Sequence, residues 1–337
     1  MKGLGKFLAI MVAAAMLLTL VPTVALAAED EDSLTGTFTC NAAPSVTSVT
    51  LTETAMTPQT EYSVTVAVSD ADDLSDLTTV VLKVWYDSDA GNPTEGQYDG
   101  ATADTQTCAI MTYTLSGDDF AIEPSASTTW SLGSCTAFDS GEKSSTTGDC
   151  IFTFTPGKVA TETTGGANWQ VAAKATDSGS QTGWGYDSTP GATMTWYGEV
   201  SVNPTTIDFG TMVAGTAFAD CTPQTVYDTS GVNYIANGAY DEKVKASSPW
   251  SGATLYTTDT DPSSMPADNF ALKADDTATL GSAVMVDTTG ATIDNTGTQT
   301  TEDGDDVDNN TLWIQLASSF TAGDYSGTIY YMVADGA

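Results

Sequence analysis

The chain has 337 residues, of which 44 are acidic and nine are basic, so its formal net charge is −35. All nine basic residues are lysines, and the sequence contains neither arginine nor histidine. Catalysis by a Ser-His-Asp or Cys-His arrangement and metal binding by imidazole are therefore excluded. An acidic chain without arginine is also repelled by nucleic acid and by anionic lipid surfaces, so neither is an expected partner.

Residues 1–27 have the pattern of a secretory signal peptide. Lys2 and Lys6 precede an apolar run at residues 7–20, and Ala-Leu-Ala at 25–27 forms an A-x-A cleavage signature. The apolar run is shorter than the roughly 20 residues that a membrane-spanning helix needs. We therefore expect a cleaved signal, a secreted or cell-surface location, and no membrane span in the mature chain. Losing two of the nine lysines leaves seven against 44 acids, a charge of about −37.

Residues 28–43 are predicted to form an extended segment before the first globular region. Leu34, Thr35 and Phe38 belong to an alternating stretch that is typical of a strand. Two interpretations remain open. The stretch is either the edge strand of its own domain or a strand that adds to the sheet of a neighbouring subunit, main chain to main chain, and so builds a filament.

Residues 44–199 show the period-2 alternation of apolar and polar residues that indicates strands. The alternation is clearest at residues 62–68, and it recurs near 81–86, 108–115, 152–154, 169–175 and 194–196. Turn residues separate these stretches, and no stretch has a helical period. The 58 threonines agree with this assignment, because their β-branch favours strands. The sequence therefore predicts a β-sandwich.

A domain boundary is predicted near residues 199–204, so that residues 200–337 form a second β-sandwich. This half opens with residues 200–204, followed by the Ile-Asp-Phe-Gly stretch at 207–215. Later strands are expected near 244–246, 270–272, 284–286, 312–316 and 329–333. The predicted fold class is thus all-β, with two sandwiches in tandem.

The first half resembles a known class of domain. Pro-Ser-Val at 44–46 leads into the strand at 62–68, then into the acidic loop at 70–74 and the strand at 80–87. This order resembles the opening of Ig-like domains in prokaryotic, particularly archaeal, surface proteins. Trp-Gln-Val-Ala-Ala-Lys-Ala-Thr-Asp at 169–177 is similar to their penultimate strand. The resemblance implies that the predicted sandwiches are Ig-like.

The second half has a related resemblance. Residues 207–215 and 320–330 resemble the first and last strands of sandwich domains in secreted pilus, biofilm-fibre and cell-wall-binding proteins. The C-terminal membrane or sorting anchor of such proteins is missing from this sequence. This departure from the pattern leaves two expectations open: the protein is released after export, or it is held at the surface by assembly with other proteins.

The five cysteines match no C-x-x-C metal or redox pattern, and disulfides are the expected state in an oxidising compartment. Cys135 and Cys150 flank a Ser/Thr-rich loop like the arms of a hairpin. A disulfide between them would contribute about 3 kcal/mol in the loop-entropy model. Cys40 with Cys108 is the second expected pair. The connectivity stays open, and Cys221 is left either buried or available to link subunits.

Acidic residues gather in two predicted loops. The first cluster follows a strand and consists of Asp70, Asp72, Asp73 and Asp76. The second precedes the strand near 312 and includes Asp303, Asp305, Asp306 and Asp308. Carboxylates at alternate positions of a turn can converge on one hard cation, and Ca²⁺ takes six to eight oxygens. The sequence thus predicts calcium at one of the clusters, with an ordinary solvated acidic loop as the alternative.

Asn309 begins Asn-Asn-Thr, the one N-x-Ser/Thr acceptor in the sequence whose middle residue is not proline. It is the predicted glycosylation site. A glycan there would compete with calcium at the neighbouring acidic cluster.

Together these features predict a non-catalytic extracellular structural protein, a self-associating subunit of a cell-surface filament or surface layer. Strand addition would assemble it, and calcium, the one expected cofactor, would stabilise it. A secreted adhesin or carbohydrate-binding module is the alternative, because Trp184, Tyr186 and Trp250 in predicted loops could stack on cell-surface glycans. A glycoside hydrolase with paired carboxylates, for example one that uses Asp187, is a third possibility.

Overall fold

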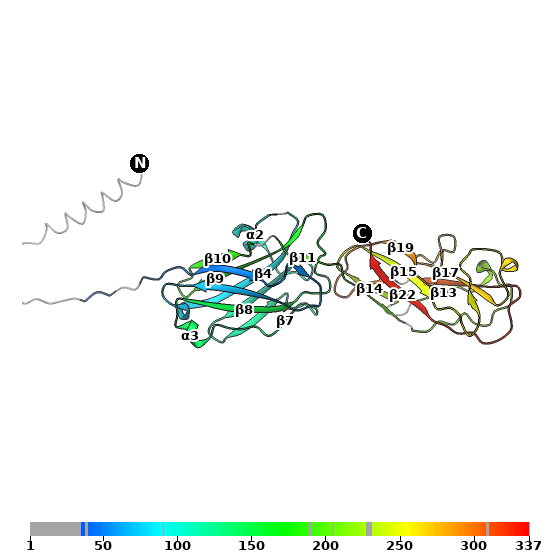
Figure 1. Cartoon of the computed structure of the whole chain (residues 1–337), viewed down its shortest axis with the longest axis horizontal. Coiled ribbons are helices and arrows are strands. Elements are labelled where there is room, and N and C mark those ends of the chain that lie inside the picture. The colour runs from blue at the N-terminus through cyan, green and yellow to red at the C-terminus, as the bar shows by residue number, and fades with distance from the viewer. Residues whose placement is uncertain are drawn as a thin grey trace, which may run out of the picture. The chain divides into compact units, whose positions relative to one another are not determined.

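The computed structural model describes residues 35–37, 40–89, 91–188, 191–203, 205–226, 231–307 and 310–336, with Asp306 and Val307 described by their backbone alone. The predicted signal peptide and the residues Leu34 and Phe38 lie outside these ranges. Residues from Asn41 onward form one compact unit, separate from the preceding residues. Strands dominate this unit, which confirms the predicted all-β class (Figure 1). Its two largest hydrophobic clusters, called the first and the second core below, are separate from each other.

Two sheets build the first region of the unit. One has the order β1-β3-β8-β7 and consists of β1 (Ser45–Leu51), β3 (Tyr62–Ser69), β8 (Thr147–Thr155) and β7 (Ser131–Leu132). The other has the order β10-β9-β4-β5-β6 and consists of β10 (Thr182–Tyr186), β9 (Asn168–Asp177), β4 (Leu77–Asp87), β5 (Cys108–Thr114) and β6 (Asp119–Glu123). All neighbours within these sheets are antiparallel. A short parallel pair joins β2 (Ala55–Met56) to β11 (Thr193–Met194).

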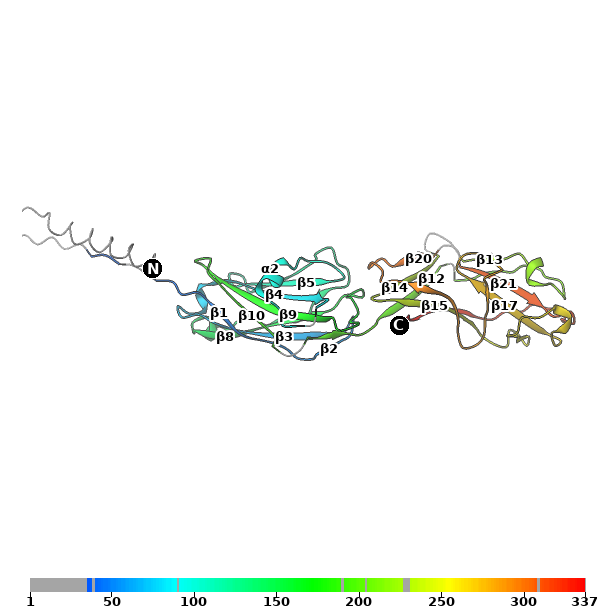
Figure 2. The same cartoon turned by 90° about the horizontal axis from the view of Figure 1, so that it is seen from above.

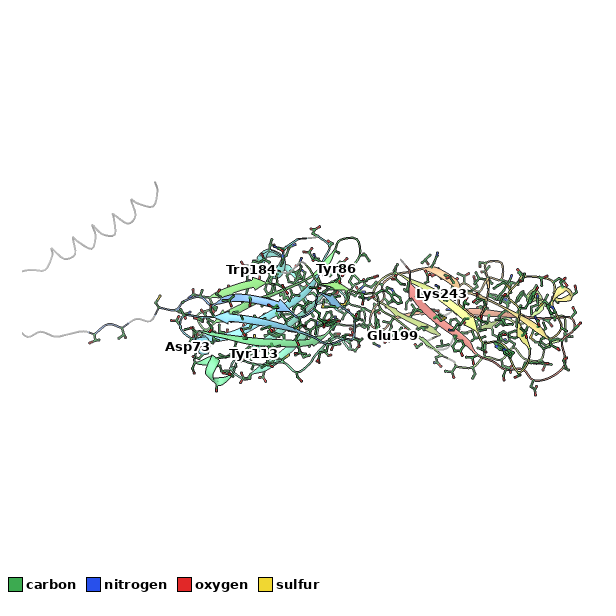
Figure 3. All side chains as sticks on the ribbon, viewed as in Figure 1. Asp73, Tyr86, Tyr113, Trp184, Glu199 and Lys243 are labelled. Atoms are coloured by element: carbon green, nitrogen blue, oxygen red, sulfur yellow. The ribbon has the colours of Figure 1, made fainter. Side chains whose placement is uncertain are left out.

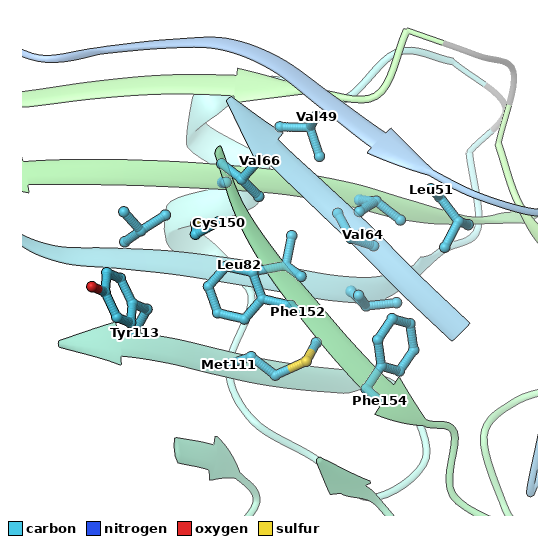
Figure 4. Close-up of a cluster of buried hydrophobic side chains, with 14 of the residues drawn as sticks. Val49, Leu51, Val64, Val66, Leu82, Met111, Tyr113, Cys150, Phe152 and Phe154 are labelled. Carbon is cyan, nitrogen blue, oxygen red and sulfur yellow. The ribbon is translucent and has the colours of Figure 1, made fainter. Parts of the chain in front are cut away.

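The core of the first region lies between these two sheets. Along β3 every second residue is buried, beginning with Tyr62, as the alternation predicted. Figure 4 shows Val64 and Phe152 from one sheet together with Leu82 and Met111 from the other. All four side chains are fully buried. Burial of apolar surface from both sheets is what holds the two layers together.

A short helix, α2 (Glu95–Gly100), covers part of the outer face of the second sheet. Its first turn is closed by a capping box between Thr94 and Gln97. Its buried Tyr98 meets Trp85 of β4 edge-to-face, with ring centroids 6.3 Å apart. Figure 2 shows α2 beside β4 and β5 on the side away from β3. A second short helix, α3 (Ser140–Lys143), connects β7 to β8 along the chain.

Three sheets build the second region. The first has the order β12-β14-β20 and consists of β12 (Gly198–Val202), β14 (Val232–Ala236) and β20 (Asp305–Val307). The second has the order β13-β21-β17-β16, with β18 (Val284–Met285) also on β17, and consists of β13 (Gln224–Thr225), β21 (Thr311–Leu316), β17 (Asn269–Asp275) and β16 (Thr254–Leu255). The third has the order β19-β15-β22 and consists of β19 (Ala291–Gly297), β15 (Tyr240–Ala246) and β22 (Ile329–Asp335).

The start of the second region agrees with the expectation only in part. The expected opening at residues 200–204 overlaps β12, whereas residues 207–215, which resemble the first strand of a sandwich domain, contain no strand. Gly210 and Gly215 have φ values of 72° and 85°, which are outside the extended conformation. Met194 packs into the first core, whereas Trp196 packs against the second. The change of core therefore falls a few residues before the predicted boundary at 199/200, which lies inside β12.

Neither predicted disulfide is present, since all five cysteines are free thiols. The predicted hairpin does form, because Thr136 pairs with Ile151. On it, Cys150 faces the first core, while the thiol of Cys135 donates to the carbonyl of Thr153 at 3.5 Å. Of the second predicted pair, Cys108 is buried beneath α2 and Cys40 is exposed. Burial among apolar side chains raises the pKa of Cys108 to about 11.

Among the described residues, no helix is both long enough and apolar enough to cross a lipid bilayer.

Candidate functional site

Three carboxylates from distant parts of the sequence meet at one end of the first region. Asp70 follows β3, Asp76 ends the 3₁₀ helix η1 (Leu74–Asp76), and Asp177 is the last residue of β9. Each offers an oxygen, and these oxygens lie within 4.8 Å of one another. Within the described part of the chain this is the one such group of three or more acidic, histidine or cysteine side chains. We call it the acidic cluster.

Sheet pairing brings the three residues together. Leu77, the first residue of β4, pairs with Asp177, so Asp76 necessarily lies beside the end of β9. The backbone of Asp70 donates to the carbonyl of Thr146 at 2.9 Å, which fixes the exit from β3. Asp73 then turns the chain with a φ of 82° and accepts from the amide of the residue two positions later, so it caps η1. Figure 3 labels Asp73 at this end of the region.

Asp70 is the most unusual member of the acidic cluster, because it is only 2% exposed. Its Oδ1 accepts from the backbone amide of Asp72 at 3.0 Å, whereas its buried Oδ2 has no hydrogen-bond partner among the described residues. Burial raises the pKa of Asp70, and the charges of Asp72, Asp76 and Asp177 raise it further, while the bond from the Asp72 amide lowers it. A buried charged oxygen without a partner is destabilising.

Asp177 is equally buried but better bonded. At 1% exposure, it accepts from the backbone amide of Gln181 at Oδ1 and from Asn41 Nδ2 at Oδ2, both at 2.8 Å. Asp76 accepts from the hydroxyl of Ser178. Every carboxylate oxygen has two lone pairs, so these bonds leave acceptor capacity on all three residues. No lysine of the described residues forms an ion pair with any of them.

The same site holds the first residues of the compact unit. The backbone amide of Ala42 donates to Asp72 Oδ2 at 2.6 Å, and Asn41 donates to Asp177 as described. The carbonyl of Asn41 accepts from Gln181 Nε2 at 3.1 Å. The chain therefore enters the first region directly across the acidic cluster.

Two of the four residues of the predicted first cluster lie close together in the structure. The structure brings Asp70 and Asp76 together, while Asp72 binds Ala42 and Asp73 caps η1. Sequence reasoning missed Asp177, which lies about a hundred positions away. The available signal was its place at the end of a predicted strand that pairs with β4.

The described residues of the predicted second cluster do not converge on one point, because they have different partners. Asp305 Oδ2 accepts from the hydroxyl of Tyr240 at 3.4 Å, and the carbonyl of Asp303 accepts from Asn233 Nδ2 at 2.9 Å. Asp306 lies in β20, and only its backbone is described. Asp308 and the predicted glycosylation site Asn309 lie outside the described residues. The described acids of this stretch do not form a close carboxylate group.

The aromatic residues proposed for sugar stacking lie in other surroundings than predicted. Trp184 and Tyr186 belong to β10 and stack on each other with ring centroids 5.5 Å apart. They also pack against the buried hydrophobic residues under α2. Trp250 is buried at 7% exposure. Asp187, the candidate carboxylate of a hydrolase, accepts from the backbone amide of Leu51 at 2.8 Å. Both tryptophans thus have faces that are already covered by protein.

A second buried polar group, unforeseen from the sequence, lies in the core of the second region. Glu242 of β15 is 3% exposed, and Tyr234, Tyr331 and Asn310 surround it. Its Oε2, both amide atoms of Asn310 and the two tyrosine hydroxyls are all buried. Burial raises the pKa of Glu242 to about 7, with further contributions from the negative charges of Asp294 and Asp276.

Comparison with known proteins gives no family assignment. No protein-family model matches the chain, and no curated protein matches it either. Among solved structures, the sporulation control protein Spo0M from Bacillus subtilis is similar over 46% of this chain and 50% of its own. The identity is 14% and the TM-score is 0.28.

Proposed function

We propose that this protein is a non-catalytic extracellular structural protein, a subunit that self-associates into a cell-surface filament or surface layer. In this proposal the first 27 residues are a cleaved signal, the two regions are Ig-like sandwiches, and calcium stabilises the assembled subunit. The observation that carries the proposal is the acidic cluster at the entry of the N-terminal segment. A cation at that point would act on the segment through which subunits are proposed to join.

The charge of the chain supports a dependence on cations. Subunits that carry about −37 each repel one another, and this repulsion is long-ranged at low ionic strength. Assembly therefore requires that bound cations, high ionic strength or strand addition offset the repulsion. A buried carboxylate oxygen without a partner, that of Asp70, is a specific place where a cation would lower this charge.

The N-terminal segment supports assembly by strand addition. Residues 35–37 and Cys40 are exposed, and they belong to none of the described strands. An exposed segment with an alternating sequence is suited to add to the edge of another sheet. The main-chain bonds would supply affinity, and alternate side chains would supply specificity.

Deleting residues 28–39 tests this proposal while keeping the contacts of Asn41 and Ala42. We expect the shortened mature protein to keep the circular dichroism spectrum and melting temperature of the full mature chain. It should form no filaments or layers in negative-stain microscopy with millimolar calcium, whereas the full chain should form them.

A point variant gives a matched control for this deletion. Thr35→Pro removes a backbone donor from the added strand and is expected to weaken assembly, whereas Thr35→Val keeps the donor and the strand preference. Unchanged assembly of the deletion variant would contradict the proposal. Binding of the monomer to a glycan array, without self-association, would instead favour the adhesin alternative.

A further inference from the structure

We infer that Asp70, Asp76 and Asp177 bind one calcium ion, and that the bound ion fastens Asn41 and Ala42 to the first region. This inference specifies the calcium site of the proposed function and rests on it only for the biological role of the fastening. The binding site itself follows from the geometry of the described residues.

Like charges in the acidic cluster require compensation. Three carboxylates offer oxygens within 4.8 Å of one another, two of the residues are almost fully buried, and no lysine of the described residues pairs with them. The interior position weakens screening by solvent, so the mutual repulsion is stronger than at a surface loop. The unpartnered Oδ2 of Asp70 lacks the interaction that a buried charged oxygen needs. A cation between the carboxylates supplies it and removes the repulsion.

The donor set favours calcium among the common cations. All three side chains are carboxylates, which are hard oxygen ligands, and the group contains no sulfur or imidazole nitrogen. The ligands come from a strand exit, a 3₁₀ helix and a strand end, and such a mixed set suits the flexible coordination of Ca²⁺ better than the strict octahedron of Mg²⁺. Backbone carbonyls or water would complete the six to eight oxygens.

The fastening follows from the hydrogen bonds that hold Asn41 and Ala42 beside the acidic cluster. Asp177 Oδ2 accepts from Asn41 Nδ2 at 2.8 Å, and Asp72 Oδ2, next to the cluster, accepts from the amide of Ala42 at 2.6 Å. Without the ion, repulsion among the carboxylates would push the β3 exit and the β9 end apart. These elements carry the acceptors for Asn41 and Ala42, so calcium keeps both acceptors in place.

Calcium titration of the full mature chain tests the binding site. Isothermal calorimetry should give one specific site, and the melting temperature should rise with calcium and fall on addition of a chelator. Asp177→Asn and Asp70→Asn should each weaken binding at least about tenfold. Asp149→Asn makes the same charge change at an exposed residue of β8 and should bind calcium as the natural chain does.

Hydrogen exchange tests the fastening. Amides of residues 41–46 should exchange more slowly with calcium than without it in the natural chain, and calcium should have no such effect in Asp177→Asn. The Asn41→Ala variant keeps every carboxylate, so it should still bind calcium but show weaker protection of the segment. If Asp70→Asn fails to fold, circular dichroism reveals this, and the other variants still decide.

The outcomes separate the site from the proposed function. No binding at millimolar calcium, or equal binding by the Asp177→Asn and Asp149→Asn variants, would overturn the inferred site. Specific binding without a calcium effect on residues 41–46 would overturn the fastening. Specific binding together with an absence of filaments or layers would support the site and count against the structural role.

Discussion

Glu242→Gln is expected to raise the free energy of unfolding by about 3 kcal/mol at pH 9 and to change it little at pH 4. The carboxyl of Glu242 has a pKa raised from 4.5 to about 7 by burial in the second core and by Asp294 and Asp276. The fold thus favours its protonated form. The protonated carboxyl of Glu242 therefore stabilises the folded state relative to the charged one. This stabilisation is fully present below the unfolded pKa of 4.5 and is lost as pH rises through about 7. Glutamine keeps the shape and remains neutral at every pH.

Urea denaturation of both proteins between pH 4 and pH 9 checks this prediction. The difference between variant and natural chain is the relevant quantity, because the many other carboxylates add the same pH dependence to both. Glu53→Gln changes an exposed side chain and serves as the control. If the free energies of unfolding of Glu242→Gln and the natural chain differ by the same amount at every pH, ionisation of the buried carboxyl does not destabilise the fold and the prediction is wrong.

Gly183→Ala is expected to lower the free energy of unfolding by about 1–3 kcal/mol. A Cβ at this position of β10 would lie 2.0 Å from the carbonyl oxygen of Pro44 and 2.9 Å from Cα of Ser45. Both obstacles are backbone atoms, which cannot turn aside as a side chain can. The added methyl group must therefore push the start of β1 away from β10.

Gly281→Ala is the matched control, because nothing lies within 4 Å of the Cβ that it adds. Both substitutions reduce the entropy of the unfolded chain similarly, so their difference isolates the steric effect. Because Pro44 lies two residues after Ala42, which is held beside the acidic cluster, Gly183→Ala should also weaken calcium binding. Equal unfolding free energies for the two variants would contradict the close approach of β1 and β10.

Local pattern was sufficient for much of the fold. The alternation at residues 62–68 predicted which side chains of β3 are buried, because successive side chains of a strand point to opposite faces. The prediction was wrong at residues 207–215, where apolar residues alternate but the glycines adopt positive φ. It was also wrong for the disulfides, since spacing along a hairpin does not fix which way each thiol points.

The candidate site could be predicted only in part. Asp70 and Asp76 are six positions apart in one loop. Their proximity could therefore be predicted from the gathering of acidic residues in that part of the sequence. Asp177 joins them because β9 pairs with β4. Likewise, Glu242 occupies an inward position of β15 between the buried Tyr240 and Val244, and its surroundings come from three other strands or strand ends.

The sequence by itself determined the large negative charge, the exclusion of histidine and arginine chemistry, and the all-β class, because these depend on composition and on a period of two residues. Only the tertiary structure decided which carboxylates meet, which are buried and which thiols stay apart. Those properties depend on strand pairing between residues about a hundred positions apart, and on which face each strand turns to the core. Local periodicity indicates which face of a strand is buried, but it does not by itself specify which distant strand lies beside it.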